Sequence, residues 1–99
     1  MPALEYLLEL QEAVRDQLGC GSRHVGTTRV VEEVDHRVLW EGDVETFMLL
    51  GHPLATRCFS WIWNQADAPR VMIVLEITPV NGPFSAVKTS LSSQQNFAC

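Results

Sequence analysis

Five consecutive apolar residues, Val71 to Leu75, place the strongest constraint on how this 99-residue chain can fold. In an extended conformation their side chains point alternately to the two faces of a sheet, so both faces must be covered. We therefore expect a strand of the kind found at the centre of a sheet. Trp61 and Trp63 lie in a second apolar stretch, and the core or an interface is expected in this half of the chain.

The charged residues are distributed unevenly. The chain has 7 Lys and Arg against 12 Asp and Glu, which gives a net charge of −5 and a pI of about 5.0. Ten of the acidic residues and four arginines lie in residues 1–50, whereas residues 51–99 hold only Asp67 and Glu76 as acids. An acidic chain without a basic patch repels phosphate backbones and anionic lipid, so neither nucleic acid nor a membrane is expected as a partner.

The N-terminal residues and the cysteines indicate the compartment. Glu5 and Glu9 interrupt the first ten residues, which do not resemble a secretory leader, so a cytoplasmic location is expected. Cys20, Cys58 and Cys99 are odd in number and lack metal-site spacing, so no disulfide framework, metal or cofactor is expected. Cys58 is interpreted as a small buried apolar residue and Cys99 as an inert thiol near a mobile end.

The first half of the chain predicts one helix and two strands. Leucines and a valine at three- and four-residue spacing predict an amphipathic helix over residues 3–18. Residues 23–34 are largely β-branched and predict a strand, followed by a turn at residues 35–37 and a second strand over 38–50. One face of the second strand is expected to carry Trp40, Gly42, Val44, Thr46 and Met48, and the other Leu39, Glu41, Asp43, Glu45 and Phe47.

The second half predicts two more strands and a helix. Gly51 and Pro53 are expected to end the preceding strand. Strands are expected over residues 57–64 and 70–78, joined by a loop at 65–69, and a helix over 83–94 with Pro83 in its first turn. Residues 1–2 and 96–99 are expected to be mobile ends.

These elements predict a single α+β domain over residues 1–99, ordered α-β-β-β-β-α, with a mostly antiparallel four-stranded sheet packed by two helices on one face. Such an arrangement leaves apolar strand surface uncovered. A homo-oligomer, most simply a dimer, is therefore expected, with Trp63, Ile73 and Phe59 in its interface. A strongly curved sheet that encloses a pocket is the competing explanation.

Two groups of side chains suggest chemistry. Glu41, Asp43 and Glu45 alternate along one strand and predict three carboxylates about 6.5–7 Å apart. A straight strand cannot wrap a Ca²⁺ ion, so a solvated face that discourages edge pairing is the favoured interpretation.

The second group surrounds a strand break. His52 lies between a glycine and a proline, and Arg57 follows shortly after it. With Trp40 and Trp61 they are expected to bound a pocket for a small anionic ligand. The favoured interpretation of His52 is nevertheless a hydrogen bond to the backbone of its own turn, and that of the tryptophans a place in the core or an interface.

The motifs W-E-G-x-V-x-x-F at residues 40–47, G-H-P-x-A at 51–55 and F-x-W at 59–61 resemble a family of short uncharacterised bacterial proteins. The similarity spans residues 24–91. It implies a small stand-alone bacterial α+β protein, such as the product of a mobile gene cassette in environmental DNA. It implies no activity, cofactor or partner.

Two functional hypotheses follow. The first is a non-enzymatic homo-oligomer that acts by binding a protein or a small molecule, because no catalytic motif is present. The second is a small-molecule or enzymatic pocket that uses His52 and Arg57.

Overall fold

A computed structural model describes residues 4–64 and 69–97. The elements in chain order are helix α1 (Leu4–Leu18), strands β1 (Gly21–Val34), β2 (Arg37–Leu50), β3 (Arg57–Asn64) and β4 (Pro69–Leu75), and helix α2 (Pro83–Phe97). The strands form one antiparallel sheet in the order β1-β2-β3-β4. The expected α+β fold and its α-β-β-β-β-α order are confirmed.

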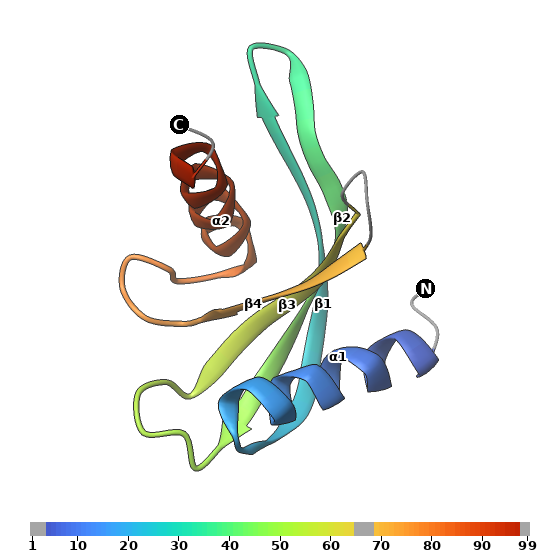
Figure 1. Cartoon of the computed structure of the whole chain (residues 1–99), viewed down its shortest axis with the longest axis vertical. Helices are drawn as coiled ribbons and strands as arrows, with labels where there is room; N and C mark the ends of the chain where they lie inside the picture. The colour runs from blue at the N-terminus through green and yellow to red at the C-terminus, as the bar shows by residue number, and fades with distance from the viewer. Residues whose placement is uncertain (1–3, 65–68, 98–99) are drawn as a thin grey trace.

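The two helices cover opposite faces of the sheet (Figure 1). The expectation that both helices pack on one face was therefore wrong. Strands β2 and β3 carry apolar side chains on both faces, and one helix on each side removes more of that surface from water than two helices on one side. The α1 face is built around Phe47 and Cys58, and the α2 face around Val44 and Phe59.

Each face has its own core, which buries Cys58, Phe59 and Trp61 of β3 and leaves the apolar residues of β4 partly exposed. The α2 face contains Val30, Val44, Phe59, Trp61, Val80, Ala86, Val87 and Leu91. The α1 face contains Leu10, Val14, Phe47, Leu49, Ala55 and Cys58. Both faces of β3 are buried at residues 58–61, as its sequence indicates, whereas β2 is buried on both faces only in its second half.

The β1–β2 hairpin is the longest feature of the sheet and projects past both helices at the top of Figure 1. Its two-residue turn holds Asp35 at φ 51° and His36 at φ 64°, the pair of positive values that a type I′ turn requires. The register shifts between His24 and Gly26 and again between Glu32 and Glu33. These bulges determine which side chains of the two strands lie opposite each other.

Strand β4 differs from its expected position and length. It ends at Leu75 instead of residue 78, where the Ile77 N–H donates to the Leu75 carbonyl at 2.9 Å and turns the chain. It also lies at the edge of the sheet and not at its centre. Consecutive antiparallel strands with short connections lie side by side, so the last strand of a meander is at an edge. Its apolar side chains face both cores, which explains its composition.

The C-terminal helix is longer than predicted. It extends to Phe97, so residues 96 and 97 belong to a helix and not to a tail. The expected mobility of residues 1–2 and 98–99, the inertness of Cys99, and loop residues 65–68 lie outside the described residues. Over the ranges 4–64 and 69–97, no helix is both long and apolar enough to cross a membrane.

Replacing His36 with glycine is expected to stabilise the fold. A non-glycine residue in the left-handed region destabilises the fold by roughly 1 kcal/mol. Glycine removes this strain but loses more conformational entropy on folding, so the net gain in stability is smaller. We expect the melting temperature to rise by a few degrees, since 1 kcal/mol corresponds to about 4–8 °C in a domain of this size. Arg37→Gly, one residue further in β2, is the control and should lower it. A fall in both variants would contradict the role of the turn.

Candidate functional site

A pocket of about 280 Å³ lies between the sheet and the beginning of α2. We call it the α2 pocket. Its walls come from β1, β2, β3 and the segment between β4 and α2. The lining residues are Val25, Gly26, Thr28, Thr46, Arg57, Phe59, Glu76, Asn81, Gly82 and Pro83.

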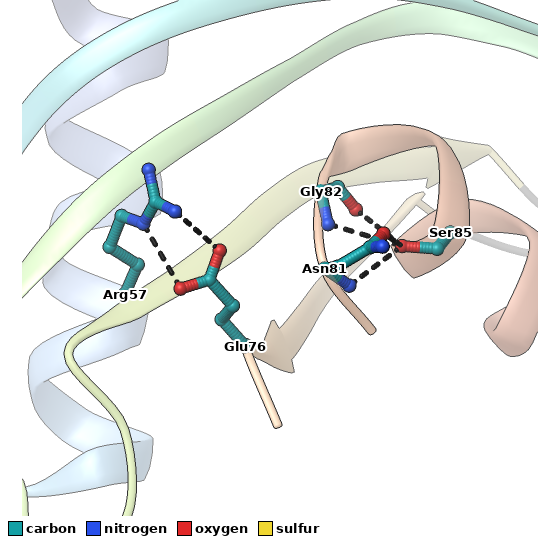
Figure 2. Close-up of polar contacts among 5 residues, drawn as sticks. All are labelled: Arg57, Glu76, Asn81, Gly82 and Ser85. Carbon is teal, nitrogen blue, oxygen red and sulfur yellow. Dashed lines mark hydrogen bonds and ion pairs between the residues drawn. The ribbon is translucent and has the colours of Figure 1, made fainter. Parts of the chain in front are cut away.

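An ion pair forms one wall of the α2 pocket. Arg57 begins β3 and Glu76 follows β4, and the Glu76 N–H donates to the Arg57 carbonyl at 2.9 Å. This backbone bond places the two side chains next to each other on the α2 face. Arg57 Nε and Nη2 donate to Glu76 Oε1 and Oε2 at 3.1 and 2.7 Å (Figure 2). The paired geometry is the strong, directional form of an Arg–carboxylate contact.

The opposite wall is the start of α2, where Ser85 satisfies the helix terminus. The Ser85 hydroxyl accepts from the Asn81 and Gly82 N–H groups at 2.9 and 3.1 Å (Figure 2). Its own proton is within reach of Asn81 Oδ1 and the Gly82 carbonyl. A side chain three residues inside a helix that bonds back to its N-cap amide is part of a capping box. These two amides are therefore engaged within the chain.

The remaining lining residues make the pocket polar without giving it a net charge. The positive charge of Arg57 is balanced by Glu76, whose side chain is only 18% exposed against 47% for Arg57. Thr46 is nine-tenths buried and brings a hydroxyl from β2, and Thr28 brings another from β1. Phe59 supplies an apolar floor. The pocket can therefore exchange hydrogen bonds with a ligand while it contacts an apolar part of the same molecule.

Only one of the four side chains expected to share a ligand pocket lines the α2 pocket. That residue is Arg57. His52 instead accepts the N–H groups of Leu54 and Ala55 on Nδ1, at 3.1 and 3.3 Å. The backbone role that the sequence favoured for His52 is the one observed.

The tryptophans belong to the core of the α2 face. Trp61 is fully buried, and the Trp40 ring packs against it at a centroid distance of 5.9 Å and an angle of 56°. The same Trp40 ring lies over Gly42, where an added Cβ would come within 2.7 Å of it. Close packing of this kind leaves neither indole free to stack on a ligand.

The three residues expected in an interface lie in different environments. Phe59 is 2% exposed and is buried within its own chain. Trp63 is partly buried against the core of the α2 face, and Ile73 against the core of the α1 face. Of the three, Ile73 alone belongs to an edge strand.

A buried polar cluster on the α1 face was not anticipated from the sequence. Glu45, expected on a solvated face with Glu41 and Asp43, is fully buried. His24 Nε2 lies 2.8 Å from Glu45 Oε1, and the Thr27 hydroxyl donates to the same oxygen. With a carboxylate as acceptor, this contact needs the form of His24 that carries a proton on Nε2. Only the register in which β1 pairs with β2 could have located the cluster, and the two bulges change that register.

Within the cluster, Glu45 is fully buried while the His24 side chain is 31% exposed. Ser60 lies directly opposite Glu45 on β3. The Ser60 hydroxyl and Glu45 Oε2 are both buried and find no partner among the described side chains and backbone. Glu41 and Asp43 remain partly exposed and pair with Arg29 at 2.8 and 3.5 Å. No group of three His, Cys, Asp or Glu side chains in the described part of the chain is placed to hold a metal ion.

The hydrogen bonds to Glu45 should contribute measurably to stability. His24→Ala and Thr27→Val each remove a donor from a buried carboxylate, and each is expected to cost about 1–3 kcal/mol of unfolding free energy. Because both act on one oxygen, the double variant should differ from the sum of the single variants by more than about 0.5 kcal/mol. Urea unfolding measures all three. Strict additivity would contradict the shared acceptor.

Two buried groups on the α1 face titrate at unusually high pH. Burial, with a smaller contribution from Cys20, raises the pKa of the Cys58 thiol to about 12. Burial and then the charge of Glu45 raise the pKa of Tyr6 to about 12. Both groups keep their protons in the folded chain at a pH where the unfolded chain loses them. Each group therefore stabilises the folded state less at high pH than at neutral pH. Cys58 is therefore an inert core residue, as expected, and not a nucleophile.

Stability should fall in alkali in a way that depends on Cys58. Its stabilising contribution is complete below the unfolded pKa of 9.0 and is lost as the pH rises toward the folded pKa of about 12. The loss from one thiol is at most about 1.4 kcal/mol per pH unit. In Cys58→Ala, the free energy of unfolding should decrease less steeply between these pH values. An unchanged slope would show that Cys58 does not contribute.

Comparison of the chain with protein-family models, curated proteins and solved structures found no match to any of them.

Proposed function

We propose that this protein binds a small molecule, neutral or zwitterionic, in the α2 pocket. The observation that carries the proposal is the Arg57–Glu76 pair held in the wall of a 280 Å³ pocket. The volume is just below the ~300–1,000 Å³ typical of pockets for drug-sized ligands, which indicates a smaller molecule.

The charge balance selects the ligand class. Arg57 alone would favour an anion, which is the ligand expected from the sequence. With Glu76 paired to it, an anion would have to compete with a carboxylate already in place. A molecule that carries both a donor and an acceptor meets no such competition, because Glu76 accepts while Arg57 keeps Nη1 available to donate. The hydroxyls of Thr28 and Thr46 add further donors and acceptors.

Binding is favoured over catalysis by the types of residue in the pocket. Its polar side chains are those of two threonines, one arginine, one glutamate and one asparagine. His24 and Cys58, the groups best suited to acid–base or nucleophilic chemistry, lie on the opposite face of the sheet. Free thiols at Cys20 and Cys58 support the further proposal of a cytoplasmic location.

The proposal is tested with a panel of amino acids and their amides, each compared with the carboxylic acid and the amine that share its side chain. Zwitterions or amides should raise the melting temperature and shift the backbone NMR signals of Thr46 and Phe59. Thr46→Val removes one hydroxyl without changing the shape, so it should weaken binding about 2- to 12-fold. Thr89→Val, at an exposed position of α2, is the matched control and should bind as the parent does.

A second variant tests the charge argument directly. Glu76→Gln leaves Arg57 without its counter-charge, so the preference should move from zwitterions to simple carboxylic acids. The proposed ligand class would be wrong if no member of the panel binds at millimolar concentration. It would also be wrong if Glu76→Gln leaves the preference unchanged.

A further inference from the structure

The two edges of the sheet differ in how well they are protected. β1 exposes Val25, Val31 and Val34, but it also carries Arg23, Thr27 and Arg29 and has a bulge near His24. These features discourage pairing with another strand. From Val71 to Leu75, β4 has no charged residue and no register shift. A strand with the composition of a sheet centre therefore lies at an edge that no other strand of the described residues pairs with.

The outward hydrogen-bonding groups of β4 can be identified from its pairing with β3. The Glu76 N–H donates to the Arg57 carbonyl, so Glu76 directs its backbone groups toward β3. Direction alternates along an antiparallel strand, and no register shift interrupts this pairing. Val71, Ile73 and Leu75 therefore direct their N–H and C=O groups away from the sheet. The Leu75 carbonyl confirms the direction, because it accepts from Ile77 at 2.9 Å and not from β3.

We propose that β4 pairs with β4 of a second copy of this chain, antiparallel and centred on Ile73. In this register, Ile73 faces Ile73 of the partner subunit, and Val71 faces Leu75 of the partner subunit. In both pairs the backbone groups point away from their own sheet. Val71, Ile73 and Leu75 can therefore all form backbone hydrogen bonds with the second chain. The second lone pair of the Leu75 carbonyl remains available for this purpose. The two sheets become one continuous sheet.

The side chains and charges agree with this register. Val71, Met72, Ile73 and Val74 are all half-buried, and an added strand covers them on both faces. Glu76 comes to lie opposite Arg70 of the partner subunit, and Arg70 is exposed in the isolated chain. Because the proposed dimer has two-fold symmetry, the contact between Glu76 and Arg70 of the partner subunit occurs twice. A register centred on Met72 would instead bring together residues whose backbone groups are bonded to β3.

Disulfide trapping tests the register in the full chain with Cys20 and Cys99 replaced by serine. Facing residues of a hydrogen-bonded pair have Cα atoms about 5.5 Å apart, which suits a disulfide. Ile73→Cys should therefore crosslink two chains on mild oxidation. Val71→Cys is the matched control, because its two copies would be roughly 13 Å apart along the strands and should not crosslink. Crosslinking at residue 71 but not at 73, or equally at both, overturns the register.

Light scattering across a range of protein concentrations, in reducing buffer, tests the association itself. The parent chain should show twice the 11.1 kDa mass of one chain. Arg70→Glu places two acids opposite each other and should raise the dissociation constant about tenfold, equivalent to about 1.4 kcal/mol. Arg37→Glu at the hairpin makes the same change of charge away from β4 and should dimerise as the parent does. A monomeric parent, or equal effects of the two substitutions, overturns the pairing.

Discussion

The need to cover both faces of the sheet governs this structure. Phe59 and Trp61 on one side of β3, and Cys58 on the other, are all fully or almost fully buried. Strands with apolar side chains on both faces are stable only between two layers. The chain meets this requirement by placing its first helix against one face and its last helix against the other (Figure 1). Because α2 begins beside the sheet, its N-terminal end and the ends of β3 and β4 enclose the α2 pocket.

Polar groups are distributed unequally between the two faces. On the α1 face, Glu45 is fully buried and takes hydrogen bonds from His24 and Thr27, so its carboxylate is part of the core. On the α2 face, the Arg57–Glu76 pair remains partly exposed in the wall of a pocket. A buried carboxylate that neighbouring side chains hold through one oxygen helps to specify the strand register, whereas a partly hydrated ion pair can exchange partners with a ligand. The proposed function accordingly belongs to the second group.

The helices that cover the faces of the sheet do not satisfy the backbone hydrogen-bonding groups at its edges. The helices cover the side chains of β4 in part, but they cannot satisfy the backbone groups of Val71 and Ile73, which lie in the plane of the sheet. Only another strand has groups in that plane with matching spacing. The helices cover the two faces of the sheet, and the pairing proposed for β4 covers its edge in the same way. It also brings a second charged residue close to Glu76, at the boundary of the α2 pocket.

The sequence by itself determined the class of fold, the order of its elements and the two faces of β2, because these depend on local periodicity, turn chemistry and β-branching. It also indicated that Cys58 is buried. The tertiary structure decided which helix covers which face, that β4 lies at an edge, and which predicted residues meet. His52 and Arg57 are near each other in sequence, yet one bonds its own turn and the other crosses to Glu76. Glu45 lies opposite Thr27 because the bulge between Glu32 and Glu33 shifts the β1–β2 register by one residue, and local periodicity does not specify such a shift.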